Sequence, residues 1–159
     1  MCKSIRSLAV AITFIGLILT GCATQAPQKT SLEIQAIQTK EFEASYDAAF
    51  AATMSVFQDQ GYIIKAADKS TGLITADSPT KQKMQLFVGQ VMKHREASAF
   101  IETTPAKLIR VRLNFVDASE SSSGYGMRGA NSAAVLDPVV YQQTFEGIQK
   151  AIFVRMGTS

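Results

Sequence analysis

Several residue types that carry chemistry are scarce in this chain of 159 residues, which has two cysteines, one histidine and no tryptophan. Two cysteines are too few for a small protein held together by disulfides. Charge of one sign is not in large excess either, since 16 Lys+Arg stand against 13 Asp+Glu. Because 47% of the residues are hydrophobic and 18% are charged, the composition excludes a disordered chain and suits one globular domain.

The N-terminal segment lacks an apolar run long enough to stay in a membrane. Lys3 and Arg6 precede an apolar or near-neutral run of 12 residues, 8–19. Twelve helical residues reach only about 18 Å, whereas the hydrocarbon core of a bilayer is about 30 Å thick. We therefore predict a secretion signal over residues 1–21 rather than a lasting transmembrane helix.

The four residues after this run, Leu19-Thr20-Gly21-Cys22, resemble the lipobox of bacterial lipoproteins. The resemblance implies cleavage between Gly21 and Cys22, a diacylglyceryl group on the Cys22 thiol, and acylation of the new amine with a chain such as palmitate. Two or more chains anchor a protein stably, since each buried methylene contributes about 0.8 kcal/mol. Residue 23 is alanine, whereas an aspartate at this position typically retains such lipoproteins in the inner membrane. By resemblance, Ala23 implies a location in the outer membrane of a Gram-negative bacterium, with the domain facing the periplasm.

Removal of the signal changes the composition of what remains. Loss of Lys3 and Arg6 leaves 14 Lys+Arg against 13 Asp+Glu, a net charge of +1 over residues 22–159. Such a balance removes the electrostatic basis for nucleic-acid binding. With Cys2 discarded and Cys22 lipidated, the folded part has no thiol for a disulfide, a nucleophile or a metal site. Residues 22–37 are polar and aperiodic, so we predict a flexible tether there and one domain over 38–157.

Helix and strand signals alternate along this domain. Apolar residues at helical spacing predict a helix over 46–60, with Ser45 as N-cap and Gly61 after its end. Residues 62–67 and 73–77 read as a β-hairpin around the turn 68–72, and 97–103 and 108–116 read as two more strands. In the last strand Ile109, Val111, Leu113 and Phe115 alternate with Arg110, Arg112 and Asn114, as in a half-buried antiparallel strand.

Two segments between these elements are less regular. Residues 79–94 match helical spacing better than strand alternation, and Ser78-Pro79 suits a helix start, so we predict a helix that packs on the sheet. Lys81, Lys83, Lys93 and Arg95 lie around its ends, and docking on an anionic membrane is the alternative use of this segment. Residues 117–136 read as a loop of about twenty residues, rich in serine and glycine.

The final helix is the clearest element. Asp137 can cap it, Pro138 suits its first position, and one apolar stripe runs along it. The stripe comprises Tyr141, Phe145, Ile148, Ile152 and Met156. Glu146 and Lys150 are spaced for an ion pair on the opposite side. Together these elements predict an α+β fold, an antiparallel sheet with the long C-terminal helix packed on one face.

This order of elements is similar to a known family. The helix opened by Tyr46-Asp47, the segment Gly61-Tyr62-Ile63-Ile64, the turn Asp68-Lys69-Ser70-Thr71-Gly72-Leu73-Ile74 and the long C-terminal helix resemble the helix-grip domains of BamC-type outer-membrane lipoproteins. The resemblance implies a helix-grip-like domain in an envelope lipoprotein and carries no catalytic motif.

No catalytic constellation is evident in the sequence. Residues 124–129 match G-x-G-x-x-G, but no strand directly precedes the motif and no helix begins at its third glycine, so a dinucleotide site is not indicated. His94 lies between Lys93 and Arg95, which disfavours metal binding, and the carboxylates are scattered. We therefore expect a protein that is not an enzyme and that needs no cofactor or metal.

Two binding modes remain open at this level. Tyr125, Met127 and Arg128 are of residue types enriched at interfaces, so we expect the 117–136 loop to bind an envelope protein. This favours a protein-interaction or envelope-maintenance module. The alternative is a small-ligand or lipid binder that uses the groove between the C-terminal helix and the sheet, which requires a cavity beneath Tyr141, Phe145 and Ile148.

Overall fold

A computed structural model describes residues 29–85, 89–122, 126 and 128–157. Within them the chain has an α+β fold, as predicted, with a seven-stranded antiparallel sheet and three helices. In chain order the elements are α2 (Ser31–Gln38), β1 (Thr39–Phe42), α3 (Tyr46–Asp59), β2 (Ile63–Asp68), β3 (Leu73–Asp77), β4 (Lys81–Gln85), β5 (Gly89–Thr103), β6 (Ile109–Ser122), β7 (Arg128–Ala134) and α4 (Pro138–Gly157).

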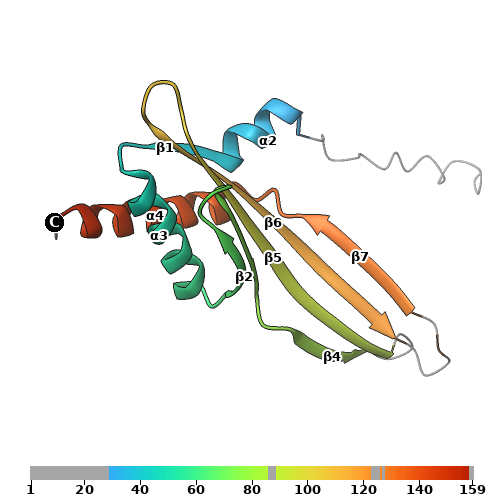
Figure 1. The fold of residues 1–159 in the computed structure, drawn as a ribbon. Helices are drawn as coiled ribbons and strands as arrows, with labels where there is room; N and C mark the ends of the chain where they lie inside the picture. The colour runs from blue at the N-terminus through green and yellow to red at the C-terminus, as the bar shows by residue number, and fades with distance from the viewer. Residues whose placement is uncertain (1–28, 86–88, 123–125, 127, 158–159) are drawn as a thin grey trace, which may run out of the picture.

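The two central strands are long and serve two different parts of the molecule. β5 has 15 residues and β6 has 14, and the two pair along their whole length. One end of the β5–β6 pair is flanked by β1 and by the β3–β2 hairpin. We call this part the helical end. The other end is flanked by β4 and β7, and Figure 1 shows it extending away from α3 and α4. We call this second part, which holds β4, β7, residues 89–95 of β5 and residues 117–122 of β6, the projecting end.

The core lies at the helical end, between the sheet and the helices α3 and α4. The predicted inward residues of β6, from Ile109 to Phe115, are all buried. Phe115 packs edge-on against Phe57 of α3 and Tyr141 of α4, with ring centroids 6.2 and 5.2 Å apart. Aromatic pairs at such distances add about 0.5–1.5 kcal/mol to the burial of their area. The alternation in β6 and the stripes of the two helices therefore meet in one core.

Both long helices begin where the sequence predicts. Ser45 Oγ accepts a hydrogen bond from the Ala48 N–H, and Asp137 Oδ1 accepts one from the Val139 N–H. The predicted stripe of α4 is buried from Tyr141 to Ile152, but Met156 is 52% exposed, so its assignment to the core is wrong. Met156 lies in the last turn, where α4 extends beyond the other elements (Figure 1). Glu146 accepts a hydrogen bond from Gln142.

The predicted hairpin also forms. β2 and β3 pair antiparallel, and the Asp68 carboxylate accepts hydrogen bonds from the N–H and the hydroxyl of Ser70 in the turn. These hydrogen bonds lower the pKa of Asp68. Gly72 closes the turn at φ +77°, a conformation that favours glycine.

The helix predicted over 79–94 is wrong. Residues 81–85 form β4 and residues from 89 onward form β5, with Lys81 opposite Lys93 and Met84 opposite Gln90. Ser78 does not cap a helix. Its Oγ accepts a hydrogen bond from the Arg95 N–H, and its own N–H donates one to the Arg95 carbonyl across the sheet. Within the described residues of this segment Met84 is 83% exposed and Val91 is buried, and spacing alone could not separate a short hairpin from an amphipathic helix.

The loop predicted over 117–136 is also wrong. β6 continues to Ser122, and β7 pairs with it from Arg128 to Ala134. Every residue of β7 is exposed. A strand that buries neither face shows no alternation of apolar and polar residues, which is why serine and glycine looked like loop material.

A short helix lies within the predicted tether. α2 begins after Thr30, whose Oγ1 accepts from the Glu33 N–H while the Glu33 carboxylate accepts from the Thr30 N–H, a capping box. The two hydrogen bonds from Thr30 lower the pKa of Glu33. α2 leads directly into β1 and thus ties residues 31–38 to the edge of the sheet.

Candidate functional site

The face of the sheet that points away from α3 and α4, here called the open face, is the candidate site. Residues of a strand alternate between two faces, so the neighbours of the buried β6 residues all point to it. At the helical end, α2 borders this face beside β1, and two adjoining hollows of about 640 and 330 Å³ share Phe100 and Arg112. The larger hollow is lined by Leu32, Gln35, Ala36, Thr39, Phe100, Glu102, Arg110 and Arg112.

One row of residues crosses the open face from strand to strand. The register places Thr39 of β1 opposite Arg112 of β6, Arg112 opposite Phe100 of β5, and Phe100 opposite Leu73 of β3. Directly opposed side chains lie about 4.5–5.5 Å apart at their Cβ atoms, so each residue of the row is in reach of the next. Phe100 and Leu73 are 43% and 44% exposed. We call these four residues the Phe100–Arg112 row.

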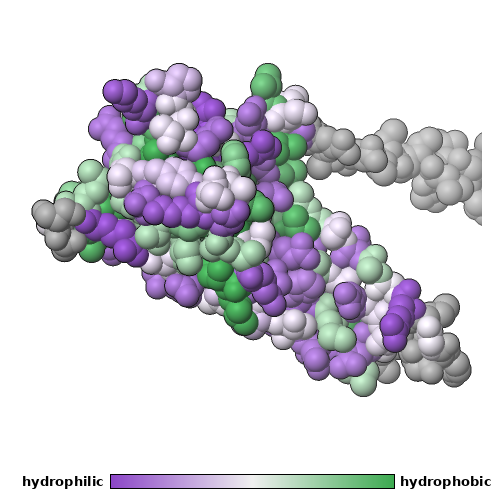
Figure 2. All heavy atoms as spheres, viewed as in Figure 1, coloured by the Kyte–Doolittle hydropathy of each residue, from purple (hydrophilic) through white to green (hydrophobic). Residues whose placement is uncertain are grey.

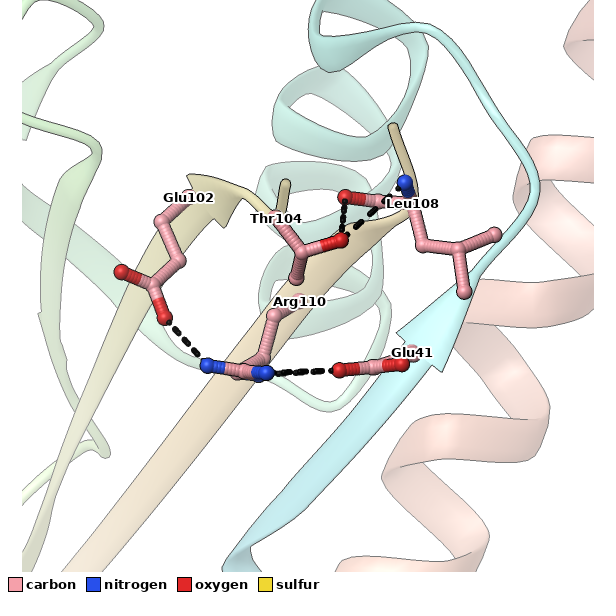
Figure 3. Close-up of polar contacts among 5 residues, drawn as sticks. All are labelled: Glu41, Glu102, Thr104, Leu108 and Arg110. Atoms are coloured by element: carbon pink, nitrogen blue, oxygen red, sulfur yellow. Dashed lines mark hydrogen bonds and ion pairs between the residues drawn. The ribbon is translucent and has the colours of Figure 1, made fainter. Parts of the chain in front are cut away.

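In the neighbouring row, ion pairs of one arginine link three strands (Figure 3). Arg110 of β6 donates to Glu41 of β1 at 2.8 and 3.0 Å and to Glu102 of β5 at 3.0 Å. The two carboxylates raise the pKa of Arg110. Thr104 and Leu108 close the β5–β6 turn beside it through paired hydrogen bonds. Because its guanidinium is already shared between two carboxylates, Arg110 holds strands together rather than offering a charge.

Arg112 is in the opposite situation. Its side chain is exposed and has no ion pair or hydrogen bond among the residues that the structure describes. Opposite it, the Thr39 hydroxyl oxygen is buried and likewise has no hydrogen-bond partner within those residues. A buried polar atom without a partner costs roughly 1–3 kcal/mol, so such atoms are uncommon unless something else satisfies them.

The Phe100–Arg112 row therefore combines complementary binding chemistry. A guanidinium offers a planar fork of donors that fits a carboxylate, and Phe100 and Leu73 offer apolar contact beside it. Arginine and aromatic residues are enriched where interfaces derive most of their binding energy. The row suits a segment that presents a carboxylate next to apolar side chains. Sequence reasoning placed Arg112 on the polar face of its strand but did not single it out.

His94 lies on the same face, within the projecting end. Its Nε2 is 3.4 Å from a Glu96 carboxylate oxygen, Ala118 stands opposite it, and Met92 and Glu96 flank it along the strand. The surroundings are those of a surface ion pair. Within the described residues, no group of three His, Cys, Asp or Glu side chains lies close enough to hold a metal ion.

The predicted partner-binding residues are only partly described. Arg128 is exposed at the start of β7, opposite Ser122, whereas Tyr125 and Met127 lie outside the described residues. Gly129, the third glycine of the G-x-G-x-x-G match, lies within antiparallel β7 and not at a helix start, which agrees with the rejection of a dinucleotide site. Gly21 and Cys22 of the predicted lipidation site also lie outside the described residues.

The space predicted for a ligand beneath α4 is filled. Tyr141, Phe145 and Ile148 are at most 5% exposed and belong to the core cluster. The Tyr141 hydroxyl donates to the Val135 carbonyl at 2.7 Å. These contacts weigh against a small ligand between α4 and the sheet.

The basic residues of segment 79–95 gather at one place. Lys81, Lys83, Lys93 and Arg95 all project to the α3–α4 side of the projecting end, because the register places them in line with Val91 and Ala97. The sequence predicted them at the two ends of a helix, and only the strand pairing brings them together.

Comparison of the chain with protein-family models and with curated proteins finds no match. None of the helices within the described residues is both long and apolar enough to cross a membrane.

Proposed function

We propose that this protein is a non-enzymatic lipoprotein, anchored through Cys22 to the outer membrane of a Gram-negative bacterium, whose domain binds another envelope protein in the periplasm. The lipobox resemblance at residues 19–22 and the family resemblance of the domain support the location. Binding of this kind suits a role in envelope maintenance.

One observation carries the proposal of protein binding: Arg112, which has no ion pair or hydrogen bond within the described residues, lies in line with the half-exposed Phe100 and Leu73. A partner segment with a carboxylate would pair with the Arg112 guanidinium, and its apolar neighbours would cover the phenyl ring of Phe100. Hydrogen bonds to a charged group contribute about 1.5–3 kcal/mol, so loss of Arg112 should weaken binding roughly tenfold or more.

The test is photo-crosslinking in cells from an unnatural photoreactive residue placed at Phe100. A defined adduct should form, should fall about tenfold with Arg112→Glu, and should persist with Lys150→Glu, which changes the net charge equally on exposed α4. Since Arg112 has no partner within the described residues, Arg112→Glu should fold normally. An adduct insensitive to Arg112→Glu, or a crosslinked peptide without a nearby carboxylate, would show that the open face does not bind as proposed.

The loop prediction can be tested in the same assay. If Tyr125, Met127 and Arg128 contribute, replacing all three with alanine should also reduce the adduct, and an unchanged set of crosslinked proteins would remove them from the interface.

Anchoring is tested separately by fractionation. Cys22→Ala should block lipidation and release the protein from the outer-membrane fraction. A variant that stayed there after a carbonate wash would contradict the lipoprotein assignment.

A further inference from the structure

A second surface lies on the other side of the sheet, where the projecting end meets α3. A groove of about 760 Å³ opens there. Its walls include Tyr62, Lys81, Lys93, Arg95, Asp117 and Asn131. In Figure 2 the dark green, hydrophobic surfaces lie mainly around the helical end, whereas the projecting end is largely purple, white and pale green.

The floor of this groove is a fixed ion pair. Arg95 and Asp117 are directly opposite each other on β5 and β6, and the guanidinium donates to both carboxylate oxygens at 2.6 and 3.0 Å. The hydrogen bonds from Arg95 lower the pKa of Asp117, and burial raises the pKa of Tyr62 beside them. The carboxylate of Asp117 is thus held mainly by Arg95, and Lys93 acts on it only through a smaller Coulombic attraction that also lowers its pKa.

Lys81 and Lys93 form the rim and stand directly opposite each other on β4 and β5. Like charges at directly opposed positions destabilise an antiparallel pair. Lys83 follows two residues along β4 on the same face, next to Val91. None of the three has an ion pair within the described residues. An anion held between Lys81 and Lys93 would remove the repulsion.

The charge is concentrated at this site. Lys81, Lys83, Lys93 and Arg95 against Asp117 make a local charge of +3, although residues 22–159 together carry only +1. The acids nearest in sequence point away: Glu96 and Glu120 lie on the open face, where Glu96 pairs with His94 and Glu120 stands opposite Met92. Ser119 and Asn131, opposed on β6 and β7, add polar groups on the groove side.

From this arrangement we infer that the groove binds the phosphate headgroup of an anionic phospholipid. The choice of lipid rests on the proposed anchor: Lys29 lies seven positions after Cys22 in the sequence, and a chain of seven residue steps spans at most about 25 Å. The domain is therefore held near a membrane surface, where headgroups are concentrated. The groove thus acts as a second, electrostatic contact that orients the tethered domain.

The test uses the lipidated protein in neutral dodecylmaltoside micelles, to which phosphatidylglycerol or phosphatidylcholine is added. Limiting acetylation with mass spectrometry measures the reactivity of each lysine. Phosphatidylglycerol should slow acetylation of Lys81 and Lys93 about fivefold. The protection should weaken in 0.5 M salt, because salt shortens the Debye length from about 10 Å at 0.1 M to about 3 Å at 1 M and so screens the attraction between the lysines and the phosphate. Lys107 and Lys150, exposed elsewhere, should react equally with both lipids.

A charge-matched pair of variants tests the site itself. Lys81→Gln/Lys93→Gln should lose the phosphatidylglycerol adduct seen by native mass spectrometry, whereas Lys107→Gln/Lys150→Gln should keep it. The first variant should melt at the same temperature as the wild type or higher, since it removes a like-charge pair. Misfolding would then not account for the loss.

Three results would overturn the inference: protection by phosphatidylcholine, uniform protection of all lysines, or equal adducts in the two variants. Equal protection by soluble inorganic phosphate at the same concentration would assign the groove to a free anion and overturn the lipid assignment. None of these results bears on the Arg112 crosslink or on the fractionation of Cys22→Ala, so a failure of the groove is distinguishable from a failure of the proposed function.

Discussion

The turn between β2 and β3 provides the sharpest test of the structure, through Gly72→Ala. Gly72 has φ +77°, and a Cβ added there would lie 2.1 Å from the Ile101 carbonyl oxygen and 2.9 Å from the Tyr46 hydroxyl. Real Cβ atoms essentially never approach closer than 3.0 Å, and here the obstacle is backbone. The turn or strand β5 must therefore move, which breaks the 2.9 Å hydrogen bond from the Ile101 N–H to the Gly72 carbonyl.

Gly61→Ala is the matched control. Gly61 has φ +84°, and a Cβ there would meet nothing within 4 Å. Both substitutions incur the left-handed backbone strain of about 1–2 kcal/mol, offset by about 0.4–1 kcal/mol from the stiffer unfolded chain. Gly61→Ala should therefore cost about 1 kcal/mol. Gly72→Ala adds about 1–3 kcal/mol for the overlap and about 1 kcal/mol for the hydrogen bond, so it should cost about 3–5 kcal/mol.

Urea unfolding followed by circular dichroism measures the difference. With a slope of about 2 kcal/mol per molar, the midpoint of Gly72→Ala should lie about 1–2 M below that of Gly61→Ala. Equal midpoints, to within about 0.3 M, would refute the close approach of the turn to β5. They would also question the position of Leu73 beside Phe100 in the candidate site, which depends on the same pairing.

Two further predictions concern a turn and an ion pair. Lys107 has φ +60°, so Lys107→Gly should raise the free energy of unfolding by about 0.5–1 kcal/mol, whereas Ala106→Gly next to it should lower it; thermal melts of both variants check the sign. The pKa of Asp117 is lowered in the folded state, so its contribution to stability is present above the unfolded pKa of about 3.9 and is lost as the pH falls through the lower folded pKa. The wild type should thus melt at a higher temperature than Asp117→Asn at pH 7, and this difference should shrink below pH ~4. A difference in melting temperature that stayed constant to pH 3 would contradict the Arg95–Asp117 pair.

Prediction from the sequence succeeds where one side of an element is buried. The stripe of α3, the stripe of α4 from Tyr141 to Ile152 and the alternation of β6 from Ile109 to Phe115 appear in the core as predicted. Ser45 and Asp137 act as caps because capping depends on residues within one turn. Such signals are local, and burial imposes a period on them.

The same reasoning fails at the projecting end, and for one physical reason. β7 is exposed along its length and Met84 of β4 is 83% exposed, so neither strand carries the alternation that identifies a half-buried strand. These strands exist because β5 and β6 continue and offer backbone partners. Backbone pairing leaves no mark in the sequence when the side chains face water on both sides.

The candidate site shows how sequence and structure divide the information. The sequence by itself determines the predicted lipid attachment at Cys22, the α+β class, and the presence of arginines on the polar side of β6. Only the tertiary structure decides that Glu41 and Glu102 neutralise Arg110 while Arg112 is left beside Thr39 and Phe100, because that depends on the register of β1 and β5 against β6. Likewise, only strand pairing places Lys81 opposite Lys93. Local chemistry specifies which elements form, whereas the charges that remain unpaired follow from contacts between residues far apart in the chain.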